Sequence, residues 1–359
     1  MKTKKQLLMS GLALALAFTA CKKDTPNPNN NTTSGAYSGG VFVTCEGLYG
    51  TGSGTVSFYN RTSGAVSNDI YMSANSSVLG NVVQSMSIYN SKGYVVVNNA
   101  GKVEVVNQDD FKAAGTITGL NMPRYFLGIS TSKGYISEWG STGTNGAIRV
   151  VNLSNNTISK TINIGSGTEK MLAVNNFVFV TNAGGFSNDS IVKVIDTNMD
   201  TLEASIQVGP NPTGIVSDVN GKIWVLCGGQ WNGSYTALAQ TGKLVRINPV
   251  TYTVEQTFIF SSTSSMPSSL TINTAKNKLY YSYLGAVYEM NITASNLSST
   301  ALINRSFYSL GIDPSNDYIY AGDAGNYSSN GKVIRFNSST GAKVDSFAVG
   351  IIPGNFFFK

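Results

Sequence analysis

Histidine is absent from all 359 residues of the sequence. Imidazole is the usual general base near neutral pH and a common ligand of zinc and iron. Its absence excludes Ser-His-Asp and Cys-His catalysis and the metal sites that depend on imidazole. We therefore expect a protein that is not an enzyme and that holds no metal or cofactor. A calcium site built from scattered carboxylates is the one metal site that the composition leaves open.

Charged side chains are scarce as well, at 12% of the chain. The formal net charge is +6, and it falls to +3 if Lys2, Lys4 and Lys5 are removed with an N-terminal leader. So small and scattered a charge argues against a nucleic-acid surface. The many Gly, Asn, Ser and Thr residues are instead typical of an exported β-protein with polar turns.

Long hydrophobic runs are missing, and the only apolar stretch near the N-terminus, from Leu7 to Phe18, is too short to span a bilayer. It follows three lysines and precedes Thr19-Ala20-Cys21, which resembles the lipobox of bacterial lipoproteins, although Phe18 stands where Leu is commoner. The resemblance implies that residues 1–20 are a lipoprotein signal peptide and that Cys21 carries the lipid. An ordinary secretory signal with an incidental cysteine is the alternative.

The segment after Cys21 is polar, rich in Pro, Asn and Gly, and without periodicity. Such a segment cannot bury enough apolar surface to offset the entropy of ordering. We predict that residues 21–40 are a flexible tether and that residues 41–359 form the folded domain.

A short apolar strand recurs along that domain at intervals of roughly 40–50 residues, the period of propellers and solenoids. Its clear copies begin at Val41, Tyr94, Val178, Ile223, Leu279 and Ile319, and Tyr135 begins a weaker one. Each copy is the second of four strands in a unit, and a third and a fourth strand follow it after polar turns.

The strand nearest the axis comes first in each unit, but only six candidates for it precede a second strand. The seventh candidate is Gly354–Phe358, at the C-terminus. We therefore predict an all-β, seven-bladed β-propeller in which the C-terminal strand completes the first blade, so that no open edge is left between the first and last blades. Cys45 and Cys227 lie at equivalent positions in the first and fifth blades, too far apart for a disulfide, and we expect both to be buried.

The repeats resemble the YncE-like seven-bladed propellers. Residues 45–60, CEGLYGTGSGTVSFYN, are similar to the opening of a family of Bacteroidetes surface lipoproteins of largely unknown function, with Cys45 where that family commonly has Asn. The resemblance covers about residues 41–359. It implies a lipid-anchored protein at the outer-membrane surface, and some relatives of this type capture cobalamin over a TonB-dependent transporter.

In a propeller, the loops that leave the second strands and enter the first strands meet at one end of the axis, the usual position of a ligand. Arg and aromatic side chains there would suit a large ligand with polar and aromatic parts. The candidates at this end are Glu46, Tyr49, Gln84, Arg124, Tyr125, Trp139, Glu169, Lys170, Trp231, Tyr235, Tyr283, Arg305, Tyr308 and Tyr327. Packing between blades is the alternative for each aromatic residue.

The largest insertion in any unit runs from Cys227 to Gly242, with Trp231 and Tyr235 near its tip. Insertions in repeat proteins map to loops and often to the working face, so these two residues are prime candidates for ligand binding. A purely structural flap is the alternative.

Three functions remain open. The first is capture of an extracellular ligand, in its sharpest form a corrinoid, for a TonB-dependent transporter of the outer membrane. The second is an adhesion or protein-interaction scaffold that uses the same face. The third is a calcium-dependent propeller lactonase, which the missing histidines do not exclude.

Overall fold

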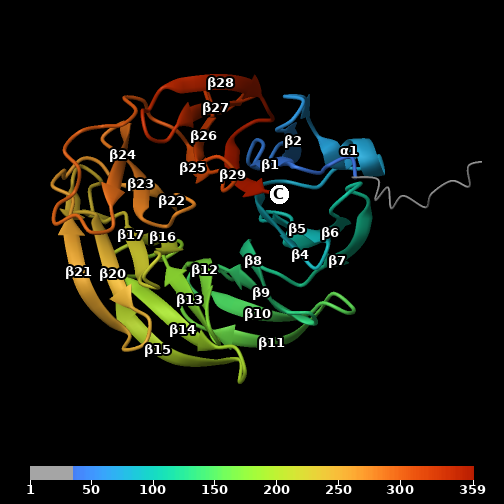
Figure 1. Cartoon of the computed structure of the whole chain (residues 1–359). Helices are drawn as coiled ribbons and strands as arrows, with labels where there is room; N and C mark the ends of the chain where they lie inside the picture. Colours follow the sequence, from blue (N-terminus) through green and yellow to red (C-terminus); the bar gives the residue numbers. More distant parts are fainter. Residues whose placement is uncertain (1–34) are drawn as a thin grey trace, which may run out of the picture. The chain divides into compact units, whose positions relative to one another are not determined.

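The structure is a computed structural model that describes residues 35–359. Seven β-sheets surround a common axis, and the C-terminus lies near the centre of the ring (Figure 1). The signal peptide predicted for residues 1–20, the lipidation predicted at Cys21 and most of the predicted tether lie outside the described residues.

Each sheet is one blade, and its strands are given below in order from the axis outward. Blades 1 to 4 each have four strands. They are β29-β1-β2-β3 (Pro353–Phe358, Gly40–Cys45, Thr55–Asn60, Val66–Ser67), β4-β5-β6-β7 (Val83–Tyr89, Lys92–Val97, Lys102–Asn107, Ala113–Ile117), β8-β9-β10-β11 (Pro123–Ser130, Lys133–Glu138, Ala147–Asn152, Thr157–Asn163) and β12-β13-β14-β15 (Thr168–Val174, Phe177–Asn182, Ile191–Asp196, Thr201–Gln207).

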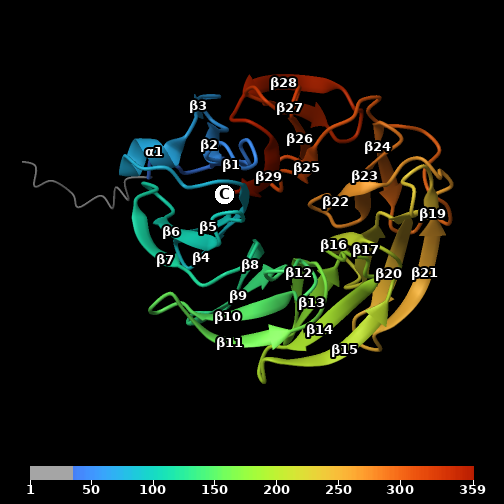
Figure 2. The same ribbon diagram turned by 180° about the vertical axis from the view of Figure 1, so that it is seen from behind.

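Blades 5 and 7 also have four strands, and blade 6 has three. They are β16-β17-β20-β21 (Pro212–Ser217, Ile223–Cys227, Lys243–Asn248, Thr253–Ile259), β22-β23-β24 (Ser268–Ile272, Lys278–Tyr283, Ala286–Asn291) and β25-β26-β27-β28 (Ser309–Ile312, Tyr318–Asp323, Lys332–Asn337, Lys343–Ala348). Figure 2 shows the same ring from behind, with the first strand of every blade nearest the axis. The prediction of a seven-bladed propeller is confirmed.

Hydrophobic clusters fill the seams between neighbouring blades, one cluster to each of the seven seams. Successive side chains of a strand point to opposite faces of its sheet, so each second strand supplies two seams. In β13, for example, Val178 and Val180 pack toward blade 3, whereas Phe179 packs toward blade 5. This is why the repeated strand is apolar at nearly every position rather than at alternate ones.

The C-terminal strand β29 closes the ring as predicted. It pairs antiparallel with β1, so that Val41 lies opposite Phe358 and Val43 opposite Phe356. Phe356 and Phe358 pack in the seam with blade 7, where the ring of Phe358 lies 5.3 Å from that of Tyr320. The two ends of the domain are thereby joined in one sheet, in which β29 covers the inner edge of β1.

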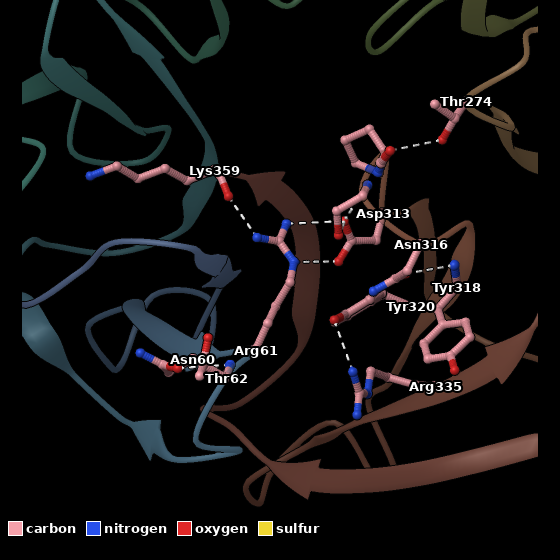
Figure 3. Close-up of polar contacts among 12 residues, drawn as sticks. Asn60, Arg61, Thr62, Thr274, Asp313, Asn316, Tyr318, Tyr320, Arg335 and Lys359 are labelled. Atoms are coloured by element: carbon pink, nitrogen blue, oxygen red, sulfur yellow. Dashed lines mark hydrogen bonds and ion pairs between the residues drawn. The ribbon is translucent and has the colours of Figure 1, made fainter. Parts of the chain in front are cut away.

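A buried ion pair reinforces the same closure. The Arg61 guanidinium of blade 1 donates to both carboxylate oxygens of Asp313, at 2.5 and 3.0 Å, and to the main-chain carbonyl of Lys359 at 2.6 Å (Figure 3). The Asp313 side chain is fully buried. Because Asp313 belongs to the turn after β25, this one arginine joins blade 7, blade 1 and the chain end.

The structure differs from the four-strand repeat in two places. In blade 6 an isolated bridge between Val287 and Ile303 stands where a fourth strand was expected, because residues 292–302 form an irregular loop. After the short strand β3, a helix that the sequence did not predict, α1 (Ile70–Asn75), buries Ile70 and Tyr71 in the seam between blades 1 and 2. Both departures lie at the outer rim, away from the axis.

Cys45 and Cys227 are buried and unbridged, as expected. Burial raises the pKa of both thiols to about 12. Among residues 35–359, no helix has the length and apolar character needed to cross a lipid bilayer.

Candidate functional site

The predicted site residues lie where second strands end or first strands begin, or in the loop inserted after β17. Antiparallel pairing puts these two positions at the same end of a blade, as the pairs Pro123–Glu138 and Pro212–Cys227 show. The ends of blades 1, 2, 3 and 7 meet there around a central cavity with a volume of about 390 Å³. This size falls within the range of small-molecule sites.

Six of the fourteen candidates predicted from the sequence line this central cavity: Glu46, Tyr49, Gln84, Arg124, Trp139 and Tyr308. Its other lining residues are Gly47, Val82, Asn98, Asn99, Met122, Phe186 and Ile352. Five aromatic or charged side chains that were separated by up to 262 residues therefore converge on one hollow.

Arg124 on β8 organises the charged part of the central cavity. Its guanidinium donates to Glu169 at 3.0 Å and to Gln84 at 2.5 Å, and it stacks on the Trp139 ring with 4.4 Å between Cζ and the ring centroid. The Trp139 indole N–H donates to the same Glu169 oxygen at 3.0 Å. Because Glu169 is buried, both partners are held in place and one face of the arginine stack is fixed before any ligand arrives.

Glu46 is the acidic group of the central cavity. Its carboxylate accepts a hydrogen bond from the Tyr308 hydroxyl at 2.9 Å. Burial raises the pKa of Glu46 above its ordinary value, and the hydrogen bond from Tyr308 and the positive charge of Arg124 only partly offset this effect. Burial and the neighbouring Glu46 charge also raise the pKa of the Tyr308 hydroxyl, which therefore stays protonated as the donor.

The closing strand also positions Glu46. The Glu46 amide donates to the Ile352 carbonyl at 2.9 Å, just before β29 begins. A Cβ added to Gly354 on β29 would lie 2.7 Å from Glu46 Oε1, so a larger residue there would displace this carboxylate. The C-terminal segment thus completes both the first blade and one wall of the cavity.

Phe186, which the sequence analysis did not select, forms the side of the central cavity next to blade 4. Its ring lies edge-on to Trp139, with 5.6 Å between centroids, yet 71% of the residue is exposed. The ring rests against Gly143, where an added Cβ would come within 2.3 Å of it. Phe186 is therefore fixed by close packing of two loops while its outer face is open to solvent.

Trp231 and Tyr235 lie outside the central cavity. The insertion that carries them contains a two-stranded hairpin, β18 (Gln230–Trp231) and β19 (Leu238–Gln240), which borders a second cavity of about 650 Å³. We call this second cavity the hairpin hollow. Phe186 lines both cavities, so the two are adjacent.

Tyr283 and Arg305 are not brought into either cavity. Tyr283 packs between blades, with its ring centroid 4.7 Å from that of Phe260, and its hydroxyl accepts the Ser262 amide at 2.7 Å. Arg305 pairs with Asp323 at 2.5 Å on the surface. The packing alternative therefore holds for Tyr283, and Arg305 has a partner of its own.

Asn98, Asn99 and Met122 line the central cavity but were not selected from the sequence. Asn98 directly follows β5 and Met122 directly precedes β8, so the rule that selected Glu46 and Trp139 could have found both. Among residues 35–359, no group of three or more Cys, Asp or Glu side chains is arranged to hold a metal ion.

Solved structures of other proteins share this fold. A quinoprotein alcohol dehydrogenase-like protein of Bacteroides thetaiotaomicron matches with a TM-score of 0.65 and 16% identity, over 90% of this chain and 78% of that one. The periplasmic gluconolactonase of Pseudomonas aeruginosa matches with a TM-score of 0.63 and 10% identity, over 88% of this chain and 98% of that one. At such identities the likeness shows the fold alone.

The gluconolactonase corrects the expectation that the chain is not an enzyme. That expectation was inferred from the missing histidines. Because this fold occurs in an enzyme, the absence of histidine does not by itself decide whether the chain is one. A search of the curated proteins finds no match. The model of one family, described as a domain of unknown function (DUF5074), matches residues 39–359, the whole of the propeller. The chain belongs to the DUF5074 family.

Proposed function

We propose that this protein is held at the cell surface by a lipid on Cys21 and captures an extracellular ligand in the central cavity. The observation that carries the proposal is the pre-ordered stack of Arg124 on Trp139, with its charged partner Glu169 buried behind it. A binding site built in advance loses little entropy when its ligand arrives.

The central cavity supports a ligand with both planar and polar parts. Tyr49 and Phe186 are 78% and 71% exposed and offer open aromatic faces. The side chains of Gln84, Asn98 and Asn99 each make one hydrogen bond to protein and keep further amide hydrogen-bonding capacity for a ligand. Glu46 supplies a single carboxylate, which would recognise a donor on the ligand.

A corrinoid is the ligand that the sequence resemblance favours, and delivery to a TonB-dependent transporter of the outer membrane is the corresponding role. A thermal-shift screen of the purified chain against cyanocobalamin, haem and Ca²⁺ tests this. A ligand present at 100 times its Kd adds about 2.7 kcal/mol to the free energy of unfolding. If no corrinoid raises the melting temperature, the corrinoid form of the proposal falls.

The membrane anchor has a separate test. Replacing Cys21 with Ser removes the thiol that the lipobox motif assigns to the lipid. We expect the Cys21→Ser variant to partition into the aqueous phase of a detergent phase separation, while the unchanged protein enters the detergent phase. Partition of both into detergent would rule out the anchor.

Hydrolysis of a lactone is the second candidate, and a specific observation favours it. Glu46 has a raised pKa, lies in a cavity and is hydrogen-bonded to Tyr308, as a carboxylate general base would be. Glu46 would take a proton from water as the water oxygen attacks the lactone carbonyl. The ring C–O bond then breaks, and the leaving alkoxide takes that proton from Glu46, which gives a hydroxy acid and restores the Glu46 carboxylate. Glu46→Gln should abolish turnover of δ-gluconolactone, whereas turnover that survives it would exclude this role.

A further inference from the structure

The hairpin hollow differs chemically from the central cavity beside it. None of its lining residues is charged: they are Ala183, Gly185, Phe186, Ser187, Asn188, Asn211, Gly229, Gln230, Trp231, Asn232, Gly233, Tyr235 and Met266. A phosphate, carboxylate or ammonium ligand would find no counter-charge there. The ligand of this hollow should therefore be uncharged.

Three aromatic side chains line the hairpin hollow. Phe186 and Tyr235 are 71% and 79% exposed, and Trp231 is partly exposed on β18. Open aromatic faces of this kind bind the apolar faces of other rings, and tyrosine and tryptophan lose little conformational entropy on binding. The hollow therefore offers flat surfaces to a ligand with flat apolar faces.

Amide side chains line the same hollow. Within the described part of the chain, the side chains of Asn188 and Gln230 make no hydrogen bond to protein, and Asn211 only approaches the Met266 sulfur at 4.0 Å. Each amide carries donors and an acceptor. A purely apolar ligand would bury these groups without partners, at a cost in free energy. The ligand should therefore carry hydroxyl or amide groups around its flat faces.

The hairpin tip is held in the shape that presents Tyr235. The backbone of Tyr235 is left-handed, with φ 57°, which is uncommon for a residue other than glycine. Asn232 stabilises it: its carbonyl accepts the Tyr235 amide at 3.0 Å, and its side-chain oxygen accepts the Thr236 amide at 3.0 Å. These two hydrogen bonds hold the hairpin tip, and with it Tyr235, in one defined turn.

From these observations we infer that the hairpin hollow is a second binding site, separate from the central cavity, for a neutral oligosaccharide. A sugar ring combines an apolar C–H face with hydroxyl groups on its rim, which matches a lining of aromatic side chains and free amides. Three aromatic platforms in about 650 Å³ favour several linked sugar rings over a single one. The inference does not depend on which ligand the central cavity binds.

The three tryptophans allow the two sites to be observed separately. Trp224 is fully buried in a seam, Trp139 lies in the central cavity and Trp231 in the hairpin hollow. In a Trp139→Phe variant, the only tryptophan open to a ligand is Trp231. A saturable change in its fluorescence reports occupancy of the hairpin hollow.

The experiment begins with an array of neutral and acidic glycans probed with the purified chain. The tightest neutral glycan is then titrated into the Trp139→Phe variant and studied by calorimetry. We expect neutral glycans to bind better than acidic ones. Trp231→Ala should weaken glycan binding at least tenfold, and Tyr235→Ala should weaken it by a smaller factor. Val250→Ala is the matched control, since Val250 is an exposed apolar residue of the same blade outside both cavities.

Three results would overturn the inference. One is an array on which no neutral glycan binds. Another is a Trp231→Ala, Tyr235→Ala double variant that keeps its melting temperature and its glycan affinity. The third is a glycan that changes the fluorescence of a Trp231→Phe variant but not that of Trp139→Phe, because the sugar would then occupy the central cavity.

Discussion

The pKa values of two carboxylates in this propeller are shifted in opposite directions. Asp313 lies at the seam between blades 7 and 1, and Glu46 lies in the central cavity. Asp313 receives two hydrogen bonds from Arg61 and two from Ser315. Burial alone would raise the pKa of Asp313, but these donors outweigh burial and hold it below its ordinary value. Glu46 has one side-chain donor, Tyr308, and burial raises its pKa.

This difference distinguishes side chains that stabilise the fold from side chains that are available to a ligand, although the residue types are the same in both places. At the seam, arginine, acid and aromatic groups satisfy one another, as Arg335 also shows by pairing with Asp345 and stacking on Tyr59 with 4.7 Å between Cζ and the ring centroid. In the central cavity, Glu46 keeps unused hydrogen-bonding capacity and Tyr49 and Phe186 face solvent. Changes at the seam should therefore reduce stability, and changes in the cavity should reduce binding.

Removal of the closing strand should have the largest effect. A chain that ends at Pro353 loses Phe356 and Phe358, both partly buried in the seam with blade 7, and full burial of such a side chain contributes roughly 1.5–3 kcal/mol. It also exposes an edge of β1 and removes one wall around Glu46. We expect aggregation and a loss of several kcal/mol in urea unfolding. A truncated chain that melts like the full one would contradict closure by β29.

Breaking the Arg61–Asp313 pair should have the next largest effect. Arg61→Ala leaves the fully buried Asp313 carboxylate with Ser315 as its only side-chain partner, and orphaning a buried charge costs about 3–5 kcal/mol. Arg305→Ala is the matched control, because the Arg305–Asp323 pair is similarly short but its arginine side chain is 51% exposed. That change should cost less than about 1 kcal/mol. Equal losses in the two variants would show that the buried pair at the seam stabilises the fold no more than an exposed pair does.

The contrast between seam and cavity also explains what the sequence could predict. The ring of blades and its closure follow from the repeated strand, because a period and a missing inner strand are properties of the sequence itself. The two irregular places are α1 and the outer edge of blade 6. Both lie at the rim, where the repeat constrains the chain least.

The site was harder to predict, because strand ends give a position along the axis and not a distance from it. Tyr283 satisfies the same rule as Glu46, yet its side chain turns into the packing around Phe260. Phe186 lies four residues beyond the end of β13 and enters the cavity because Gly143 and Gly185 let two loops pack closely. That approach depends on tertiary contacts that no local pattern records.

Within the central cavity, Tyr49 and Arg124 should separate binding from stability. Tyr49 is 78% exposed, so Tyr49→Ala should leave the melting temperature unchanged while weakening binding of cyanocobalamin, if that is the ligand, by roughly 1 kcal/mol or more. Arg124→Ala should weaken binding too, but it also leaves buried Glu169 with Trp139 as its remaining partner and should lower stability. Calorimetric titration and thermal melts of both variants check this. A Tyr49→Ala variant that binds normally would remove Tyr49 from the site.

The smallest expected effect is the most direct test of the two carboxylates. A carboxyl with a raised folded-state pKa contributes stability below its ordinary pKa, and that contribution is lost as the pH rises through the folded-state value. A carboxyl with a lowered pKa contributes stability above its ordinary pKa and loses it as the pH falls through the folded-state value. Stability measured by urea unfolding between pH 3 and 7 should therefore show opposite slopes for the two groups. Relative to the unchanged protein, Glu46→Gln should gain stability as the pH rises above about 4.3, the ordinary value for Glu, and Asp313→Asn should gain it as the pH falls below about 3.9, the ordinary value for Asp. If the stability difference from the unchanged protein changed with pH in the same direction in both variants, the pKa values of Asp313 and Glu46 would not be shifted in opposite directions.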